Sequence, residues 1–219
     1  LMSAPLLAVA SEDEDGAWIT FSTTDTFGAD SEASRWHYWF DAQARYFDLG
    51  SGRSQWLARP AIGYAVRQDM RAWIGYARFR TRNSVGDVST ENRFWQQLDY
   101  TRRGWMDGQL TLRARLEQRS VSSGDDLGVV LRLMAKYARP IGDASNAKLV
   151  IGLEPFFNLN DTDWGGNSRL SQNRTFVGVG WQFTDRAAIE AGYMNQYLFI
   201  DAAPDRNNHL AVANFKVTF

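Results

Sequence analysis

Cysteine is absent from the 219 residues, and histidine occurs only twice. A chain without thiols has no disulfide framework, thiolate metal site or cysteine nucleophile. The formal net charge of −1 gives no long-range positive field, so we do not expect nucleic acid as a partner. Aromatics reach 14%, yet no apolar run attains the length of about 18 residues that a transmembrane helix needs.

The first ten residues are uncharged and mostly apolar. They end in Ala8-Val9-Ala10, directly before an acidic run that starts at Ser11. This arrangement resembles the end of a secretory signal with its cleavage site. We therefore expect 1–10 to be a signal-peptide remnant and 11–219 to be one domain. The alternative is a disordered apolar N-terminus.

Apolar and polar residues alternate along most of the chain, which predicts strands. In the segment 109–119, Leu110, Leu112 and Leu116 share one face, whereas Arg113 and Glu117 share the other. The segments 36–48 and 173–183 repeat the pattern. Further candidates are 53–67, 71–82, 91–103, 128–139, 148–160, 187–199 and 207–219, with a shorter one at 17–24.

The length of these segments favours a membrane barrel over a soluble sandwich. Soluble strands average about five to six residues, whereas a tilted strand needs about nine to eleven to cross a bilayer. Charged faces fit a polar lumen, and closure leaves no unpaired edge in lipid. The sequence therefore predicts an all-β fold, an antiparallel transmembrane β-barrel of about ten to twelve strands in the bacterial outer membrane.

Connections alternate between short ones, such as 68–69 and 185–186, and long ones, such as 160–172. Short periplasmic turns and long outer loops produce this rhythm. About eleven segments are found, although an even number is expected when both termini are periplasmic. Either 17–24 is not a full crossing, or one strand is missed.

The last strand ends with Phe215, Val217 and Phe219 on one face. A terminal aromatic on an alternating strand resembles the signal that the barrel-assembly machinery reads. We therefore expect that machinery and outer-membrane lipid as partners of a monomeric chain.

Four strings carry a family resemblance: Glu91-Asn-Arg93-Phe-Trp-Gln-Gln97, Arg113-Ala-Arg115-Leu-Glu117-Gln-Arg119, Arg59-Pro-Ala-Ile-Gly-Tyr64 and Gly192-Tyr-Met-Asn-Gln-Tyr197. They resemble the domain of unknown function 2490, a family of predicted outer-membrane barrels. The similarity runs from about Trp18 to Phe219 and implies a fold and a location but no activity.

Strand parity places a set of charged side chains in the lumen, with basic residues in excess. They are Asp41, Arg45, Arg59, Arg78, Arg80, Arg93, Asp99, Arg113, Arg115, Glu117, Arg119, Arg132, Lys136, Glu154, Arg174 and Glu190. One interpretation is a brace, in which guanidinium and carboxylate groups pair across strands. The other is a narrow, anion-preferring pore or an anionic-ligand site.

Enzymatic activity needs a base, and only His37 and His209 offer an imidazole. A lipid acyl hydrolase is the runner-up function, but no serine stands two residues from either histidine. Asp125-Asp126 and the pair of Asp161 and Asp163 lack the full spacing of a calcium loop. Gly178-Val-Gly180 lies within a predicted strand and is no nucleotide loop. We expect neither cofactor nor metal, and a structural or passive pore role.

Overall fold

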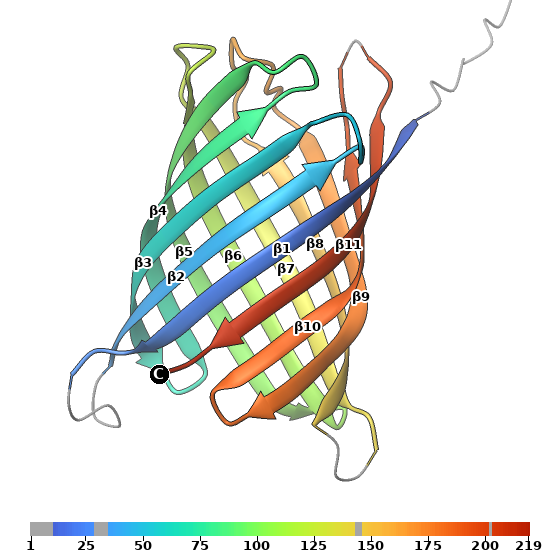
Figure 1. Cartoon of the computed structure of the whole chain (residues 1–219). Helices are drawn as coiled ribbons and strands as arrows, with labels where there is room; N and C mark the ends of the chain where they lie inside the picture. The colour runs from blue at the N-terminus through green and yellow to red at the C-terminus, as the bar shows by residue number, and fades with distance from the viewer. Residues whose placement is uncertain (1–10, 29–34, 143–145, 202) are drawn as a thin grey trace, which may run out of the picture.

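The computed structural model describes residues 11–28, 35–142, 146–201 and 203–219. Within them the chain forms eleven strands that close into one barrel (Figure 1). The strands are β1 (Glu12–Thr26), β2 (Trp36–Phe47), β3 (Ser54–Arg67), β4 (Met70–Arg82), β5 (Val88–Trp105), β6 (Gly108–Val121), β7 (Gly128–Pro140), β8 (Ala147–Asn158), β9 (Leu170–Thr184), β10 (Ala187–Leu198) and β11 (Arg206–Val217). The expected signal segment, 1–10, lies outside the described residues. No helix in the described part is long and apolar enough to cross a membrane.

The strands follow one another around the barrel in sequence order, each antiparallel to the next. The barrel closes where β1 lies parallel to β11, from Glu12 beside Arg206 to Thr23 beside Val217. An odd number of strands must close with one parallel pair. Neither explanation offered for the odd count holds: 17–24 is part of the full 15-residue strand β1, and the eleven strands of the described residues close through the parallel pair. The predicted all-β barrel of about ten to twelve strands is confirmed, with antiparallel pairing everywhere except between β1 and β11.

The two ends of the barrel differ in their connections (Figure 1). The turns 68–69, 106–107 and 185–186 lie at one end, called here the short-turn end, together with the end of β11. The loops 83–87, 122–127, 159–169 and 199–205 lie at the other, called the long-loop end, where β1 begins. The predicted alternation of short and long connections is present where turns of two residues alternate with longer loops, whereas the connections from β1 to β2 and from β7 to β8 at the short-turn end are longer than two residues.

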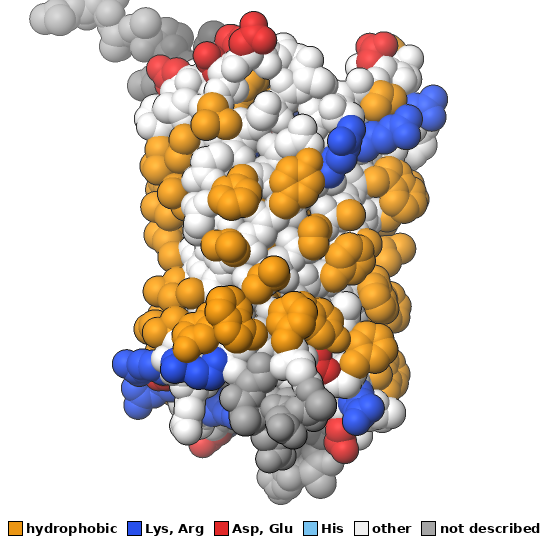
Figure 2. Space-filling view, turned by 90° about the vertical axis from the view of Figure 1, so that its left-hand side faces the viewer, with side chains coloured by type: hydrophobic (Ala, Val, Ile, Leu, Met, Phe, Trp, Pro, Cys, Tyr) orange, Lys and Arg blue, Asp and Glu red, His pale blue; other side chains and the backbone are white. Residues whose placement is uncertain are grey.

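The outer wall is apolar over most of its height. Ile74 is 56% exposed, Leu112 40% and Trp181 46%. Figure 2 shows hydrophobic side chains covering one face of the wall between rims that carry charged side chains. Since alternate residues of a strand point to opposite faces, the apolar half of each alternating segment lies outside.

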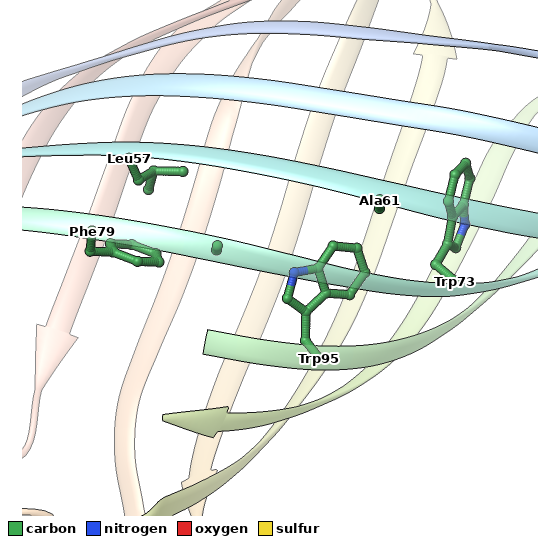
Figure 3. Close-up of a cluster of buried hydrophobic side chains, with 6 residues drawn as sticks. Leu57, Ala61, Trp73, Phe79 and Trp95 are labelled. Atoms are coloured by element: carbon green, nitrogen blue, oxygen red, sulfur yellow. The ribbon is translucent and has the colours of Figure 1, made fainter. Parts of the chain in front are cut away.

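The inner face combines aromatic and charged side chains. A buried cluster consists of Leu57, Ala61, Trp73, Ala77, Phe79 and Trp95, contributed by β3, β4 and β5 (Figure 3). Gly75 makes room for this cluster, because a β-carbon there would overlap the indole of Trp95. A second cluster joins Trp18 of β1 to Leu210 and Val212 of β11 beside the parallel pair.

Arg78 and Arg80 do not face the lumen, so that part of the prediction was wrong. The buried side chains of β4 are Trp73, Ala77 and Phe79, at the odd positions. Arg78 and Arg80 occupy even positions and are exposed. Arg80 lies opposite Trp56, which is 52% exposed on the outer wall, and neighbours directly opposite each other share a face.

Candidate functional site

Glu117 is the centre of the charged lumen. The R-x-R-x-E-x-R string of β6 places every second residue from Arg113 to Arg119 on the inner face. The Oε1 atom of Glu117 accepts a hydrogen bond from Arg132 of β7 at 2.6 Å, and Oε2 accepts from Arg119 at 2.7 Å and from Arg93 of β5 at 3.1 Å. The side chain is 1% exposed, so three strands are joined through one buried carboxylate.

Glu154 of β8 is a second carboxylate centre. Its Oε1 accepts from Arg132 Nη2 at 2.6 Å and from Arg113 Nη2 at 2.5 Å, and Arg174 of β9 lies 3.8 Å from Oε2. Arg132 therefore bridges Glu117 and Glu154. The result is a continuous ion-paired network from β5 to β9, called here the central network.

Further ion pairs lie beside the central network. Arg59 of β3 donates two hydrogen bonds to Asp41 of β2, at 3.0 and 2.5 Å. Lys136 of β7 donates to Glu190 of β10 at 2.5 and 2.6 Å. Since β7 and β10 are not adjacent, this last pair connects strands through the interior.

Aromatic rings lie against the guanidinium groups of several inner arginines. The guanidinium carbon of Arg45 lies 3.7 Å from the ring centroid of Trp18, and that of Arg174 lies 4.7 Å from the same ring. Arg115 lies 4.2 Å from the ring of Trp95 and 5.4 Å from that of Trp39 on β2. Contacts of this kind stabilise a cation, most strongly where water is excluded.

Arg115 differs from the other inner arginines because it is fully buried and its two terminal nitrogens form no hydrogen bonds with the described residues. It is 0% exposed, its Nε donates to Gln97 at 2.6 Å, and its Nη1 lies 3.7 Å from Glu117 Oε1. Neither Nη1 nor Nη2 has a hydrogen-bond partner among the described residues. Trp95 is also 0% exposed, so bulk water reaches neither of these two side chains.

The other residues expected in the lumen also lie on the inner side of their strands. Asp99 accepts a hydrogen bond from Gln97 at 2.7 Å. Arg93 and Arg119 lie opposite each other, nearer the long-loop end than Glu117, with side chains that are 11% and 15% exposed. Sequence reasoning missed Glu91, which accepts from Arg93 at 2.8 Å. Its parity with Arg93, two residues on, could have identified it.

An open cavity of about 430 Å³ lies at the long-loop end. Arg119, Phe156 and Gln172 line it from the strands, and Arg169 and Asp201 line it from the loops, where they form an ion pair at 2.7 Å. Since Arg119 also belongs to the central network, the network forms part of the cavity wall.

Within the described residues, neither histidine has a serine as a hydrogen-bond partner. On the outer wall, His209 Nδ1 lies 2.6 Å from the hydroxyl of Tyr193, and Nε2 lies 3.1 Å from Asn207 Nδ2 and 3.4 Å from Asp13 Oδ1. Tyr193 and His209 line an open groove of about 360 Å³. His37 faces the lumen, 9% exposed, with its ring 6.2 Å from that of Trp73.

The loop carboxylates bind backbone amides. Asp163 accepts hydrogen bonds from the backbone N–H groups of Asp125 at 2.9 Å and Asp126 at 3.2 Å. The Asp163 N–H in turn donates to Asp126 Oδ2 at 2.8 Å. These hydrogen bonds lower the pKa of Asp163. The described residues contain no group of three or more carboxylates or histidines arranged for a metal ion.

The expected assembly residues lie at the short-turn end. Phe215 is 42% exposed on the outer wall, and Phe219 is 68% exposed just beyond β11. Val217 is the last residue of β11 and lies beside Thr23. Their role in assembly stays a prediction.

The comparisons with known proteins agree with the resemblance noted in the sequence. The model of a family of unknown function, DUF2490, matches residues 15–208, so the chain belongs to this family. An uncharacterised protein of Methylorubrum extorquens is 29% identical over 224 aligned residues, which span 100% of this chain and 94% of the relative. No solved structure matches.

Proposed function

We propose that this chain is an outer-membrane β-barrel with a structural role, whose lumen is closed to free diffusion by the central network and the aromatic rings beside it. The outer wall supports the membrane placement. Its strands run for 12 to 18 residues, longer than the about nine to eleven that a bilayer crossing needs. Large apolar side chains such as Ile74 and Trp181 are exposed on this wall. The contact of so much apolar surface with water would be unfavourable in free energy.

The observation that best supports a closed lumen is the complete burial of Arg115 and Trp95. An ion or solute crossing at their level would have to displace side chains that are paired or stacked. An interior of this width in a small barrel is filled by side chains. The barrel therefore acts through its surfaces and loops, not as an open passage.

A narrow anion pore is the second candidate, because of the charge balance. Of the inner residues named above, nine are Arg or Lys and six are Asp or Glu, Glu91 included. Rings of excess arginine favour anions. The same excess, with the cavity beside Arg119, also supports an anionic-ligand barrel. For a lipid acyl hydrolase, the groove at His209 offers Tyr193 and Asp13 as partners, but none of the described residues that line it is a serine.

The deciding experiment measures conductance. The refolded chain is inserted into planar bilayers, and insertion is verified by heat-modifiable gel mobility and by fractionation with outer membranes in cells. A closed barrel predicts negligible conductance, and Trp95→Ala, which removes one of the buried rings, predicts a measurable increase. Phe94→Ala is the matched control, since Phe94 is 52% exposed on the outer wall of the same strand.

Two results would count against the proposal. Steady conductance by the unaltered chain, with anion selectivity in the reversal potential, would establish the pore instead. A chain that stays in the soluble fraction and migrates identically before and after heating would remove the membrane placement altogether.

A further inference from the structure

Three arginines form a row on the outside of the barrel. Arg78, Arg80 and Arg82 occupy alternate positions of β4, and all three are exposed. Alternate residues of a strand lie about 7 Å apart on one face. The row ends at the loop 83–87, and Figure 2 shows Lys and Arg side chains gathered in a row near the upper edge of this wall.

The row is not neutralised by the chain itself. None of the three arginines forms an ion pair with a carboxylate in the described part of the chain. Some other exposed arginines are paired, such as Arg67 with Asp69 at 2.8 Å, whereas Arg102, Arg103 and Arg186 form no ion pair among the described residues either but are not aligned in one row. The neighbours of Arg80 on β3 and β5 are Trp56 and Thr90, which are both uncharged.

The row also lies at a defined height on the wall. On the same face of β4, towards the short-turn end, Tyr76 is 40% exposed and Ile74 is 56% exposed. The Tyr76 hydroxyl donates to Asn92 at 2.5 Å, beside Arg78 in the register. Tyrosine and tryptophan gather at the boundary between hydrocarbon and headgroups. This step rests on the proposed function: with Ile74 in hydrocarbon, the three guanidinium groups reach the headgroup layer.

We infer that Arg78, Arg80 and Arg82 bind the phosphate groups of an anionic lipid in the leaflet at the long-loop end. A planar guanidinium pairs with phosphate through two parallel hydrogen bonds, and three at this spacing contact the phosphates of one headgroup or of neighbouring ones. Trp56, 52% exposed beside the row, supplies an apolar surface for the attached acyl chains.

The test measures lipid binding by native mass spectrometry on the full chain, refolded in non-ionic detergent. The probe is a bisphosphorylated glucosamine-disaccharide lipid, compared with the same lipid after removal of both phosphates. We expect the triple variant Arg78→Gln, Arg80→Gln, Arg82→Gln to bind the phosphorylated probe about tenfold or more weakly. The corresponding triple lysine variant, which keeps the charge but loses the paired geometry, should lie between the two.

The matched control removes three charges from the short-turn end, with Arg102→Gln, Arg103→Gln and Arg186→Gln. These residues are exposed and do not form one row on a strand face, so this variant should bind the phosphorylated probe as the unaltered chain does. Equal losses in both triple variants would mean that net charge alone acts, and would overturn the inference.

Three further results would overturn it. They are unchanged binding by the β4 variant, equal binding of the dephosphorylated lipid, and displacement of the probe by inorganic phosphate at the same concentration, which would show that the acyl chains contribute nothing. Heat-modifiable mobility of the same samples tests the proposed function separately. A β4 variant that keeps this mobility but no longer binds the lipid supports both the membrane barrel and the lipid site. An unaltered chain without heat-modifiable mobility would contradict the proposed function, and this inference with it.

Discussion

The guanidinium of Arg132 donates to Glu117 at 2.6 Å from the neighbouring strand, with side chains that are 6% and 1% exposed. A second hydrogen bond of Arg132 reaches Glu154 on its other side. One cation is thus shared by two carboxylates, and removal of either carboxylate leaves buried positive charge without its partner.

Glu117→Gln should therefore destabilise the barrel strongly. The change leaves Arg93, Arg119 and Arg132 close together without their shared carboxylate. Breaking a buried pair in this way costs about 3–5 kcal/mol. The measurement is the urea midpoint of the refolded chain, with conductance recorded on the same variant.

Glu12→Gln is the control, because Glu12 is exposed at the start of β1, and its midpoint should barely change. In a water-filled pore, screening would limit the effect of Glu117→Gln to about 1 kcal/mol or less and would shift permeation further towards anions. That pair of results would contradict a closed lumen.

The depth of the apolar band is tested on one face of β6. Leu112 is 40% exposed on the outer wall, between Leu110 and Leu116 on the same face. An arginine near the bilayer midplane costs about 2–4 kcal/mol, and one near the interface costs about 0–1 kcal/mol. Leu112→Arg should therefore lower the unfolding free energy in vesicles much more than Ser120→Arg, which changes an exposed residue of the same face near the long-loop end. Similar losses would show that no hydrocarbon surrounds Leu112.

Gly75 tests the packing of the aromatic cluster. A β-carbon at this position would overlap the indole of Trp95 and lie 2.8 Å from the carbonyl oxygen of Pro60. Overpacking of this kind costs about 1–3 kcal/mol, so Gly75→Ala should lower the urea midpoint and change the tryptophan emission. Gly152→Ala is the control, since the nearest atoms to its β-carbon are 3.8 Å away. A neutral Gly75→Ala would mean that Trp95 is not held as described.

The fold could be predicted from the sequence because alternation in long segments is a strong signal. Segments such as 109–119, with leucines on one face and charges on the other, correspond closely to strands such as β6. The parallel contact of β1 with β11 could not be predicted. Parity within a strand carries no information on which distant strand completes the sheet, so the odd count of strands remained unexplained.

The inner charges were predicted well where one face of a strand is clearly apolar. On β4 the expected pattern is reversed: the aromatic residues Phe79 and Trp73 lie inside, whereas the charged residues Arg78 and Arg80 lie outside. The assumption that charge belongs in the lumen fails here, because arginine is tolerated at the rim of the outer wall. The aromatic rings that stack on Arg115 come from other strands, and no local pattern predicts such a contact.

The contact between the loops 122–127 and 159–169 should depend on pH. Hydrogen bonds from the backbone N–H groups of Asp125 and Asp126 lower the pKa of Asp163 below its ordinary value of 3.8. A lowered pKa in the folded state means that the ionised form stabilises the contact at higher pH and that this stabilisation is lost as the pH falls below about 3.8. The protection of the Asp125 and Asp126 amides, measured as the ratio of the intrinsic to the observed exchange rate at the same pH, should therefore fall in acid.

Asp163→Ala should remove that protection at every pH, with Asp161→Ala as the control carboxylate of the same loop. Asp161 accepts from the Ser168 N–H at 2.6 Å and has no contact with Asp125 or Asp126 among the described hydrogen bonds. Protection of the two amides that does not respond to pH, or that survives Asp163→Ala, would assign the contact between the loops to other groups, such as Trp164, whose indole donates to Asp126 O at 2.9 Å.

A substitution at Phe219 distinguishes the stability of the folded barrel from its assembly in cells. Phe219 is 68% exposed beyond the last strand, so its side chain contributes little packing to the folded barrel. Phe219→Ala should leave the urea midpoint of the refolded chain within about 0.5 kcal/mol of the unaltered one. If the assembly machinery reads this residue, the amount of heat-modifiable barrel in cell membranes should fall severalfold. Phe183→Ala removes a ring that is 59% exposed near the same end, and should reduce neither quantity by that much. Equal membrane levels for the two variants would show that Phe219 is an ordinary rim aromatic. A large loss of stability on refolding would show that its contacts in the barrel, and not recognition, explain its position beyond β11.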